Sequence, residues 1–435
     1  MKKIYLLSLL FYSILSFSQT YKPLDTLDYK ERKAFLESYS KNNLQYTQFI
    51  KSKYQGEHSR YLLKNYEHFQ QELRERIKDK DYYHKGPFNN YLQSLIVKMR
   101  AKNPIIPNNL LLLVDKDNVP NAATVGDGIV VVNMGLFTIL DNEEQLIAVL
   151  GHEIGHQILE HSTKWQSTNF LRSKDSKAQT QEIVKAKHNK ADKAFSLYKN
   201  ILYGNSIERR KHETEADSLG YVLFSNVGTH KFEYKNALKN LKIYDTISPL
   251  VVEKEFYKKI FHTPTTPFKE SWLKMEDFSS YNYSHYKNKI DKDSISSHPE
   301  MEIRIDKIAH TFNELKAETP AITNNDTEFA TLKKIAKWEI VPNYFYRKEY
   351  GMGIYYLLQA QSHHLLNDEK YFDTWMGKYF SQIYEARKNY TLNRYIDRLE
   401  PKEQDESYQQ FLSFMWNLSL EDIKSISDYY TKKSS

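Results

Sequence analysis

The chain has 435 residues, of which 40% are hydrophobic and 14% aromatic, enough to fill the cores of two or three domains. It contains no cysteine, which excludes disulfide bonds and a lipid anchor on an N-terminal cysteine. The formal net charge is +7, and residues 162–212 hold 12 Lys and Arg against 4 Asp and Glu. This one segment therefore carries all of the excess positive charge.

Residues 1–18 have the features of a signal peptide. Lys2 and Lys3 precede an apolar run from Ile4 to Phe17, and small residues flank a cleavage point between Ser18 and Gln19. We therefore expect export to the periplasm or cell envelope, with an uncleaved anchor as the alternative. No later run approaches the roughly 18 apolar residues of a membrane span, so the mature protein is expected to be soluble or peripheral.

Residues 19–84 are expected to form a helical N-terminal region. Between Asp28 and about Lys80, apolar residues recur at near-helical intervals among charged ones, and the pattern ends at Gly86-Pro87. We expect a helical layer here, followed by a domain over residues 85–318.

Two strands are expected early in that domain. Leu110 to Val114 follows two prolines and is continuously apolar. Ile129 to Asn133 is rich in β-branched residues and follows Gly126-Asp127-Gly128, a tight turn. The second strand leads directly into the segment with the strongest chemical signal.

That signal is the pentapeptide His152-Glu153-Ile154-Gly155-His156, an HExxH motif. On a helix, histidines four residues apart share one face, so both can bind one metal ion at about 2.0–2.1 Å while Glu153 faces the open coordination position. Asp141 to Glu144 supplies an N-cap and an acidic first turn, and Leu146 to Ile158 supplies an apolar stripe. The alternative is a pair of core histidines satisfied by hydrogen bonds. The pattern favours a zinc hydrolase.

A third protein ligand is needed to complete such a site. His161 has the wrong spacing, because the HExxHxxGxxH arrangement requires glycine and histidine where this chain has Leu159 and Ser162. We expect His161 to be a structural residue or one that supports a metal ligand. Glu213 and Asp217 are better placed, since they lie four residues apart on one face of an expected helix. Glu213 can bind the metal, and Asp217 can accept a hydrogen bond from a metal-bound histidine. The alternative is an ordinary charged helix exposed to solvent.

A basic helical insertion, residues 162–208, separates the two segments. It can lie on an anionic membrane surface, giving peripheral contact through residues 162–212, or it can gate the site; its apolar residues cluster near Phe195 to Leu202. A solvated helical hairpin is the alternative. No nucleic-acid partner is expected, because no recognised module accompanies the charge and an exported protein rarely meets nucleic acid.

Residues 319–435 are expected to form a helical C-terminal domain. After a polar linker at Thr323–Thr327, helices are expected at Gly353–Ala360, Tyr371–Ala386 and Tyr408–Leu418. Their aromatic residues suggest hairpins like degenerate tetratricopeptide repeats, although the spacing is too irregular to define a repeat. Such a domain can recruit a protein partner or simply close the catalytic domain.

Four stretches share their order and spacing with one known family. They are Asn121–Leu136, Gly151–His156, Arg210–Gly220 and the pair His298-Pro299 with Arg304-Ile305. Through them the chain resembles the zinc metallopeptidases that include HtpX, the CAAX prenyl endopeptidases and the Oma-type and periplasmic quality-control proteases. The resemblance covers about residues 85–312, roughly half of the chain. One departure is Arg209, which stands where the family commonly has serine.

The resemblance implies a fold and a site. The fold is α+β and predominantly helical, a zincin-like catalytic domain with a small β-sheet and an HExxH helix, flanked by helical N- and C-terminal regions. The zinc ligands are His152, His156 and Glu213, as in gluzincins, with one Zn²⁺ per chain and Asp217 orienting a ligand. Glu153 is the general base, which takes a proton from a zinc-activated water and returns it to the leaving amine.

Two further expectations concern the walls of the site. In similar proteases the strand at Ile129–Asn133 is an edge strand beside the cleft, where an extended peptide can pair with it; a strand covered on both sides is the alternative. By the same resemblance, His298 or Arg304 folds back toward the metal. Either residue can then stabilise the oxyanion or occupy the open coordination site, although His298 can also be a simple helix-entry residue.

The sequence thus predicts a zinc-dependent endopeptidase of the cell envelope. Its expected substrates are unfolded or misassembled polypeptides, as in quality control, a step that rests on the family resemblance. The alternative is a latent or inactive protein of the same fold that acts as a chaperone or scaffold. The presence of Glu153 together with all three ligands argues against this alternative.

Overall fold

A computed structural model describes most of the chain as helices around one small sheet. It covers residues 21–124, 126–185, 190–246, 250–275, 301–317, 322, 326–400 and 404–435. The predominantly helical α+β fold expected from the sequence is confirmed. The predicted signal peptide, residues 1–18, lies outside the described residues.

The sheet contains four short strands in the order β1-β2-β4-β3. β4 pairs in parallel with β2 and antiparallel with β3, so it is an inner strand. The expectation of an edge strand at Ile129–Asn133 is therefore wrong. The tight turn at Gly126 and Gly128, with φ values of +95° and +88°, folds β3 back along β4, and β3 takes the edge instead. The strands are β1 (Tyr82–Tyr83), β2 (Leu111–Asp115), β3 (Ala122–Thr124) and β4 (Ile129–Asn133).

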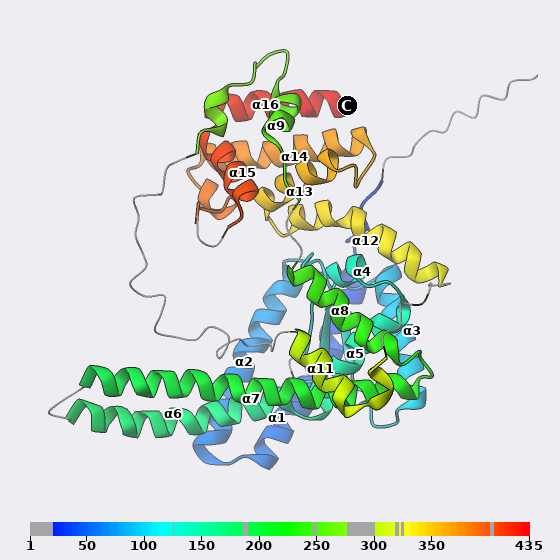
Figure 1. Ribbon diagram of the computed structural model, residues 1–435, viewed down its shortest axis with the longest axis vertical. Coiled ribbons are helices and arrows are strands. Elements are labelled where there is room, and N and C mark those ends of the chain that lie inside the picture. The colour runs from blue at the N-terminus through cyan, green and yellow to red at the C-terminus, as the bar shows by residue number, and fades with distance from the viewer. Residues whose placement is uncertain are drawn as a thin grey trace, which may run out of the picture.

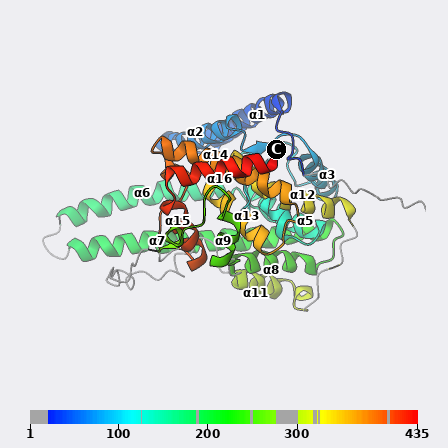
Figure 2. The same cartoon turned by 90° about the horizontal axis from the view of Figure 1, so that it is seen from above.

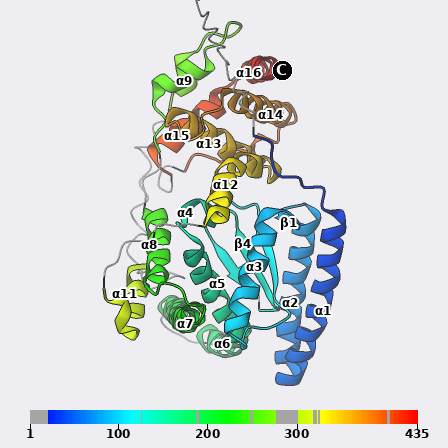
Figure 3. The same ribbon diagram turned by 90° about the vertical axis from the view of Figure 1, so that its right-hand side faces the viewer.

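Helices cover both faces of this sheet (Figure 3). On one face lie α1 (Tyr29–Lys53) and α2 (Gly56–Lys78), whose core with the sheet includes Leu113 and Ile129. On the other lie α3 (Pro87–Lys102) and the HExxH helix, with Val130 and Val132 from β4. Because side chains alternate across a strand, neighbouring residues of β4 serve the two cores in turn.

The HExxH helix is α5 (Glu143–Ile158), preceded by the short α4 (Gly135–Ile139). Asn142 caps α5 as expected, since its side chain accepts a hydrogen bond from the backbone N–H of Gln145. The fully buried Glu233 accepts hydrogen bonds from the side-chain amides of Asn142 and Gln145, both at 2.8 Å. These bonds hold the N-terminus of α5 on α8 (Phe232–Thr246).

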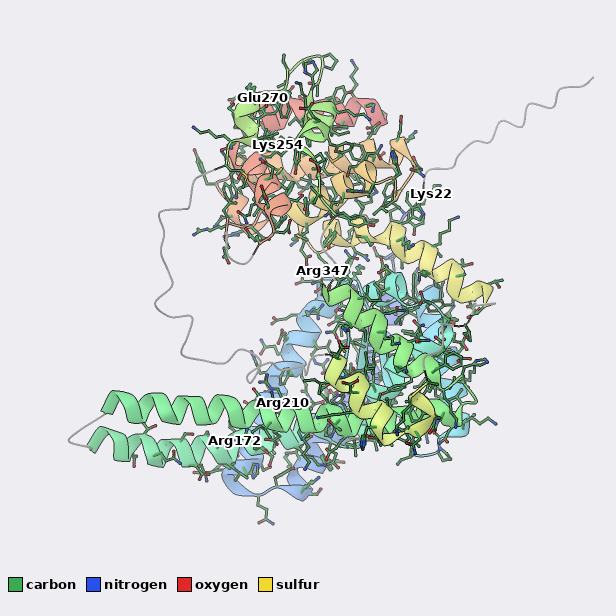
Figure 4. The ribbon with its side chains drawn as sticks, in the orientation of Figure 1. Lys22, Arg172, Arg210, Lys254, Glu270 and Arg347 are labelled. Carbon is green, nitrogen blue, oxygen red and sulfur yellow. The ribbon has the colours of Figure 1, made fainter. Side chains whose placement is uncertain are left out.

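The predicted insertion is a helical hairpin made of α6 (His161–Lys185) and α7 (Lys190–Asn226). It extends away from the rest of the molecule (Figures 1 and 2). Arg172 on α6 and Arg210 on α7 lie near the root of this extension (Figure 4). Within the described residues, no helix has the length and apolar character required to span a membrane. The side chains of Phe195 to Leu202 lie outside the described part.

A second core lies in the C-terminal part, where helices are present over all three stretches expected from the sequence. It also includes residues 252–273, from within the segment predicted as the protease domain, so the boundary near residue 319 remains a prediction, as does the repeat-like character. Arg347, at the junction of the two parts (Figure 4), pairs with Asp115 of β2 at 3.1 Å. The remaining elements are α9 (Lys254–Phe261), η1 (Glu270–Leu273), α11 (Met301–Thr311), η3 (Asn313–Leu315), α12 (Thr327–Tyr346), α13 (Tyr350–Ser362), α14 (Glu369–Lys388), η4 (Leu392–Arg394), α15 (Glu406–Asn417) and α16 (Leu420–Ser434).

Candidate active site

The site forms where α5 and α7 cross at very short range. A Cβ atom built on Gly220 would lie 2.8 Å from the backbone N of His152, and one on Gly151 would lie 2.9 Å from the carbonyl O of Gly220. Gly155 meets Ala216 in the same way, with its Cβ position 3.1 Å from the Ala216 carbonyl. Small residues at these positions therefore let the two backbones approach closely enough for side chains of both helices to converge.

His152 and His156 from α5 converge with Glu213 from α7. The two Nε2 atoms are 3.0 Å apart, and they lie 3.4 Å (His152) and 3.5 Å (His156) from the nearest carboxylate oxygen of Glu213. Tetrahedral zinc with bonds of about 2.0–2.1 Å requires ligand atoms about 3.3 Å apart. Both the donor types and their separations thus fit one zinc ion held by these three side chains.

The second nitrogen of His152 faces Asp217, one turn after Glu213 on α7. The Nδ1 to Oδ1 distance is 2.8 Å, so the imidazole proton lies on Nδ1 and is donated to Asp217. The lone pair of Nε2 is then available to bind the metal. Arg304 from α11 donates to both oxygens of Asp217, at 2.9 and 2.6 Å, and its Nη1 is 3.6 Å from Glu213. The positive charge of Arg304 thus compensates the negative charges of the buried Asp217 and Glu213 carboxylates.

This arrangement moves the pKa values of the ligand groups in opposite directions. Burial and the Arg304 charge disfavour protonated His152, but Asp217 and Glu213 outweigh them and raise its pKa to about 10. Burial and the neighbouring His152 lower the pKa of His156 to about 2. Burial opposes ionisation of Glu213, yet its hydrogen bond and charge interaction with His152, together with Arg304, lower its pKa to about 2.

Glu153 lies beside the ligands and faces the same cleft. It is 9% exposed, and burial, opposed by the His152 charge, raises its pKa to about 7. A carboxyl group with this pKa can both accept and return a proton near neutral pH. The environment of Glu153 therefore suits a general acid–base residue.

The cleft has a volume of about 660 Å³ and is bordered on one side by β3. Gln157 of α5 holds this strand in place: its Oε1 accepts from the Thr124 hydroxyl at 3.1 Å, and its Nε2 donates to the Gly126 carbonyl at 3.1 Å. Other walls come from the root of the α6–α7 hairpin, where the Arg209 guanidinium stacks 4.5 Å over the Trp165 ring, and from α8 and α11.

The structure brings together five residues that the sequence singled out, with Arg304 against them. Arg304 lies on Asp217, and His298 falls outside the described residues. Sequence reasoning missed the helix-crossing glycines, although glycine inside an amphipathic helix is itself a signal of close packing. It also missed the role of Tyr234, whose hydroxyl donates to the Asp217 carbonyl at 3.1 Å. The five are His152, Glu153, His156, Glu213 and Asp217.

The sequence profile of Peptidase family M48 matches residues 88–312, a stretch that contains the HExxH helix, Glu213 and Arg304. The chain belongs to this family. Family M48 comprises HtpX/Ste24-type zinc metallopeptidases, so the chain is an M48 zinc metalloendopeptidase with a His-His-Glu candidate metal site. No curated protein sequence matches the chain.

Proposed function

We propose that this M48 peptidase uses one zinc ion to cleave unfolded or misassembled polypeptides in the cell envelope. The observation that carries the catalytic part is the convergence of His152, His156 and Glu213 next to Glu153, whose pKa is raised by burial. A bound zinc would polarise a peptide carbonyl and lower the pKa of a water toward about 7. Glu153, which lies beside the ligands, is the residue that would take a proton from water and return it to the leaving amine.

The other polar groups act on the ligands. Asp217 holds His152 in the tautomer that presents Nε2 to the metal, and Arg304 holds Asp217 with two hydrogen bonds. This placement supports Arg304 as a positioning residue. Stabilisation of the oxyanion remains proposed for His298, to be tested by comparing kcat of His298→Ala with that of wild type; an unchanged kcat would contradict it.

Edge strand β3 supports the proposed preference for extended, unfolded substrates. It borders the cleft, and among the described strands it has a neighbour, β4, on one side only. An edge strand offers backbone hydrogen bonds that do not depend on side-chain sequence, so any extended peptide can add to it. Such pairing would draw substrate across the metal site without a defined recognition sequence.

Two regions supply proposed contacts outside the cleft. The root of the basic hairpin contributes Trp165 and Arg209 to the cleft wall, which supports a gating role, and its basic extension suits an anionic membrane surface. The C-terminal helices offer a surface for a protein partner. Export is proposed from the features of residues 1–18, and a mature N-terminus at Gln19 in a bacterial host would support it.

Casein cleavage by the purified mature chain tests the catalytic proposal. We expect cleavage that a chelator stops and zinc restores, and that Glu153→Gln lowers by about 10²–10⁴-fold while zinc stays bound. Glu144→Gln, in the first turn of the same helix, is the matched control and should cleave at the wild-type rate. Absence of cleavage by a zinc-loaded wild type would contradict the proposal and favour the scaffold alternative.

A further inference from the structure

A line of hydrogen bonds leads from the proposed zinc ligand His156 toward solvent. His156 Nδ1 is 2.9 Å from His161 Nδ1, and His161 Nε2 is 3.1 Å from Glu215 Oε2. His161 is buried, whereas the Glu215 side chain is 40% exposed and its Oε1 is 3.7 Å from Lys211 Nζ. His156 thus has polar partners on both sides of its ring.

The hydrogen-bond capacities of these groups permit one arrangement of protons when His156 binds metal through Nε2. The proton of neutral His156 must then lie on Nδ1, which donates to His161 Nδ1. His161 consequently carries its own proton on Nε2, which donates to the Glu215 carboxylate. Each donor faces one acceptor, so the line fixes the tautomer of His156 that a metal requires.

A break between α5 and α6 directs His161 to the back of the His156 ring. Glu160 has φ +58°, a left-handed conformation that is uncommon for a residue other than glycine. Its backbone N–H donates to the Gln157 carbonyl, and α6 begins at the next residue. His161 follows His156 by five residues, a spacing that keeps it from joining the ligands of α5. The same spacing suits its contact with Nδ1 of His156.

The ring of His212 packs flat on His161, with centroids 4.2 Å apart and planes 11° from parallel. His161, His212 and Glu215 also lie close enough together to suggest a second metal site. The lone pairs of parallel stacked rings do not converge on one point, however, and His161 Nδ1 already faces His156. The geometry favours a stacked support for His161 over a second metal centre.

We propose that His161 and Glu215 are positioning residues that fix the tautomer and ring orientation of His156 and thereby strengthen its bond to zinc. This inference rests on the proposed function, because it requires His156 to be a ligand. Loss of such an outer partner typically weakens metal binding by about 10–100-fold. His161 does not touch substrate in this scheme and acts only through His156.

The test compares zinc affinity, measured by competition with a chromophoric chelator, among variants of the full mature chain. His161→Phe keeps the ring that stacks on His212 but removes both hydrogen bonds, and should bind zinc about 10–100-fold more weakly. His161→Gln retains an acceptor and a donor and should recover most of this loss. Glu215→Ala, at an exposed position, should weaken binding by roughly tenfold.

His58→Phe is the matched control. His58 also stacks on an aromatic ring, with its centroid 4.4 Å from that of Phe170 and planes 18° apart, and its buried Nε2 has no hydrogen-bond partner among the described residues. This substitution should leave zinc affinity unchanged. The absorption spectrum of the cobalt-substituted protein gives a second readout, since a reoriented His156 shifts the bands in His161→Phe but not in His58→Phe.

Each outcome decides the proposal. Wild-type zinc affinity in both His161→Phe and Glu215→Ala would overturn it, as would equal losses in His161→Phe and His161→Gln, which would indicate packing alone. If His161→Phe fails to fold, Glu215→Ala decides by itself. Two zinc ions in wild type and one in His161→Phe would replace the positioning role with a second metal site. If wild type binds no zinc, the proposed function fails first, and the inference fails with it.

Discussion

Two clusters of two histidines and one glutamate lie side by side on α5, α6 and α7, yet their arrangements differ. In the first cluster, the ligand atoms of two helices converge at 3.0–3.5 Å. In the second, the rings of His161 and His212 stack in parallel, and the nitrogens of His161 point along a line of hydrogen bonds from His156 to Glu215. The direction of the ligand lone pairs thus distinguishes the two clusters: those of the first meet at one point, as a metal site requires, and those of the second do not. The first cluster is His152, His156 and Glu213; the second is His161, His212 and Glu215.

The largest expected effect separates two glutamates of α7, one from each cluster. Glu213→Ala removes a ligand and should weaken zinc binding by more than the roughly 100-fold upper range for outer partners, whereas Glu215→Ala should stay near tenfold. Chelator competition on both variants measures the difference. Equal losses would mean that the two clusters are not functionally distinct.

A smaller effect on zinc affinity is expected from Asp217, which contacts the proposed ligand His152. Asp217→Asn keeps an oxygen near His152 Nδ1 but removes the charge that pairs with buried Arg304, so zinc affinity should fall by about 10–100-fold. Urea unfolding should also show a loss of up to about 3–5 kcal/mol, because Arg304 keeps only its longer pairing with Glu213 at 3.6 Å. An unchanged stability would show that Glu213 alone compensates the Arg304 charge.

The pH dependence of zinc binding tests the raised pKa of His152. Below about pH 10, Asp217 and Glu213 favour a proton on His152 that zinc must displace. Lowering the pH strengthens this competition, so affinity should fall by about tenfold per unit from about pH 8 to about pH 6. In Asp217→Asn the slope should be shallower over this range. A zinc affinity of wild type that does not change between about pH 8 and about pH 6 would contradict the raised pKa of His152.

The smallest expected effect concerns the helix crossing that brings the first cluster together. Gly220→Ala places a methyl group 2.8 Å from the His152 backbone N, which costs about 1–3 kcal/mol and is partly offset by the roughly 1 kcal/mol better helix propensity of alanine. The net loss of unfolding free energy should be about 1 kcal/mol, with weaker zinc binding. Val222→Ala, on the exposed face of α7, should change stability by less than about 0.5 kcal/mol. A stabilised Gly220→Ala would show that the helices have room to separate.

Much of the catalytic core was predictable because its signals are local. His152 and His156, like Glu213 and Asp217, lie four residues apart, and a helix alone places each pair on one face. The N-cap Asn142 and the glycine turn before β4 are equally local signals. The edge position of β3 was missed, because a strand's neighbours depend on how distant segments pair.

The sequence by itself determined which residues share a helix face and therefore which chemistry is available, since helical hydrogen bonds connect residues only a few positions apart. Only the tertiary structure decided that α5 and α7 cross at their glycines, that β3 borders the cleft, and that the ring of His161 contacts Nδ1 of His156. Interhelical distance and ring orientation depend on packing between segments far apart in the chain, and a local pattern such as a glycine within a helix does not say which segment packs against it.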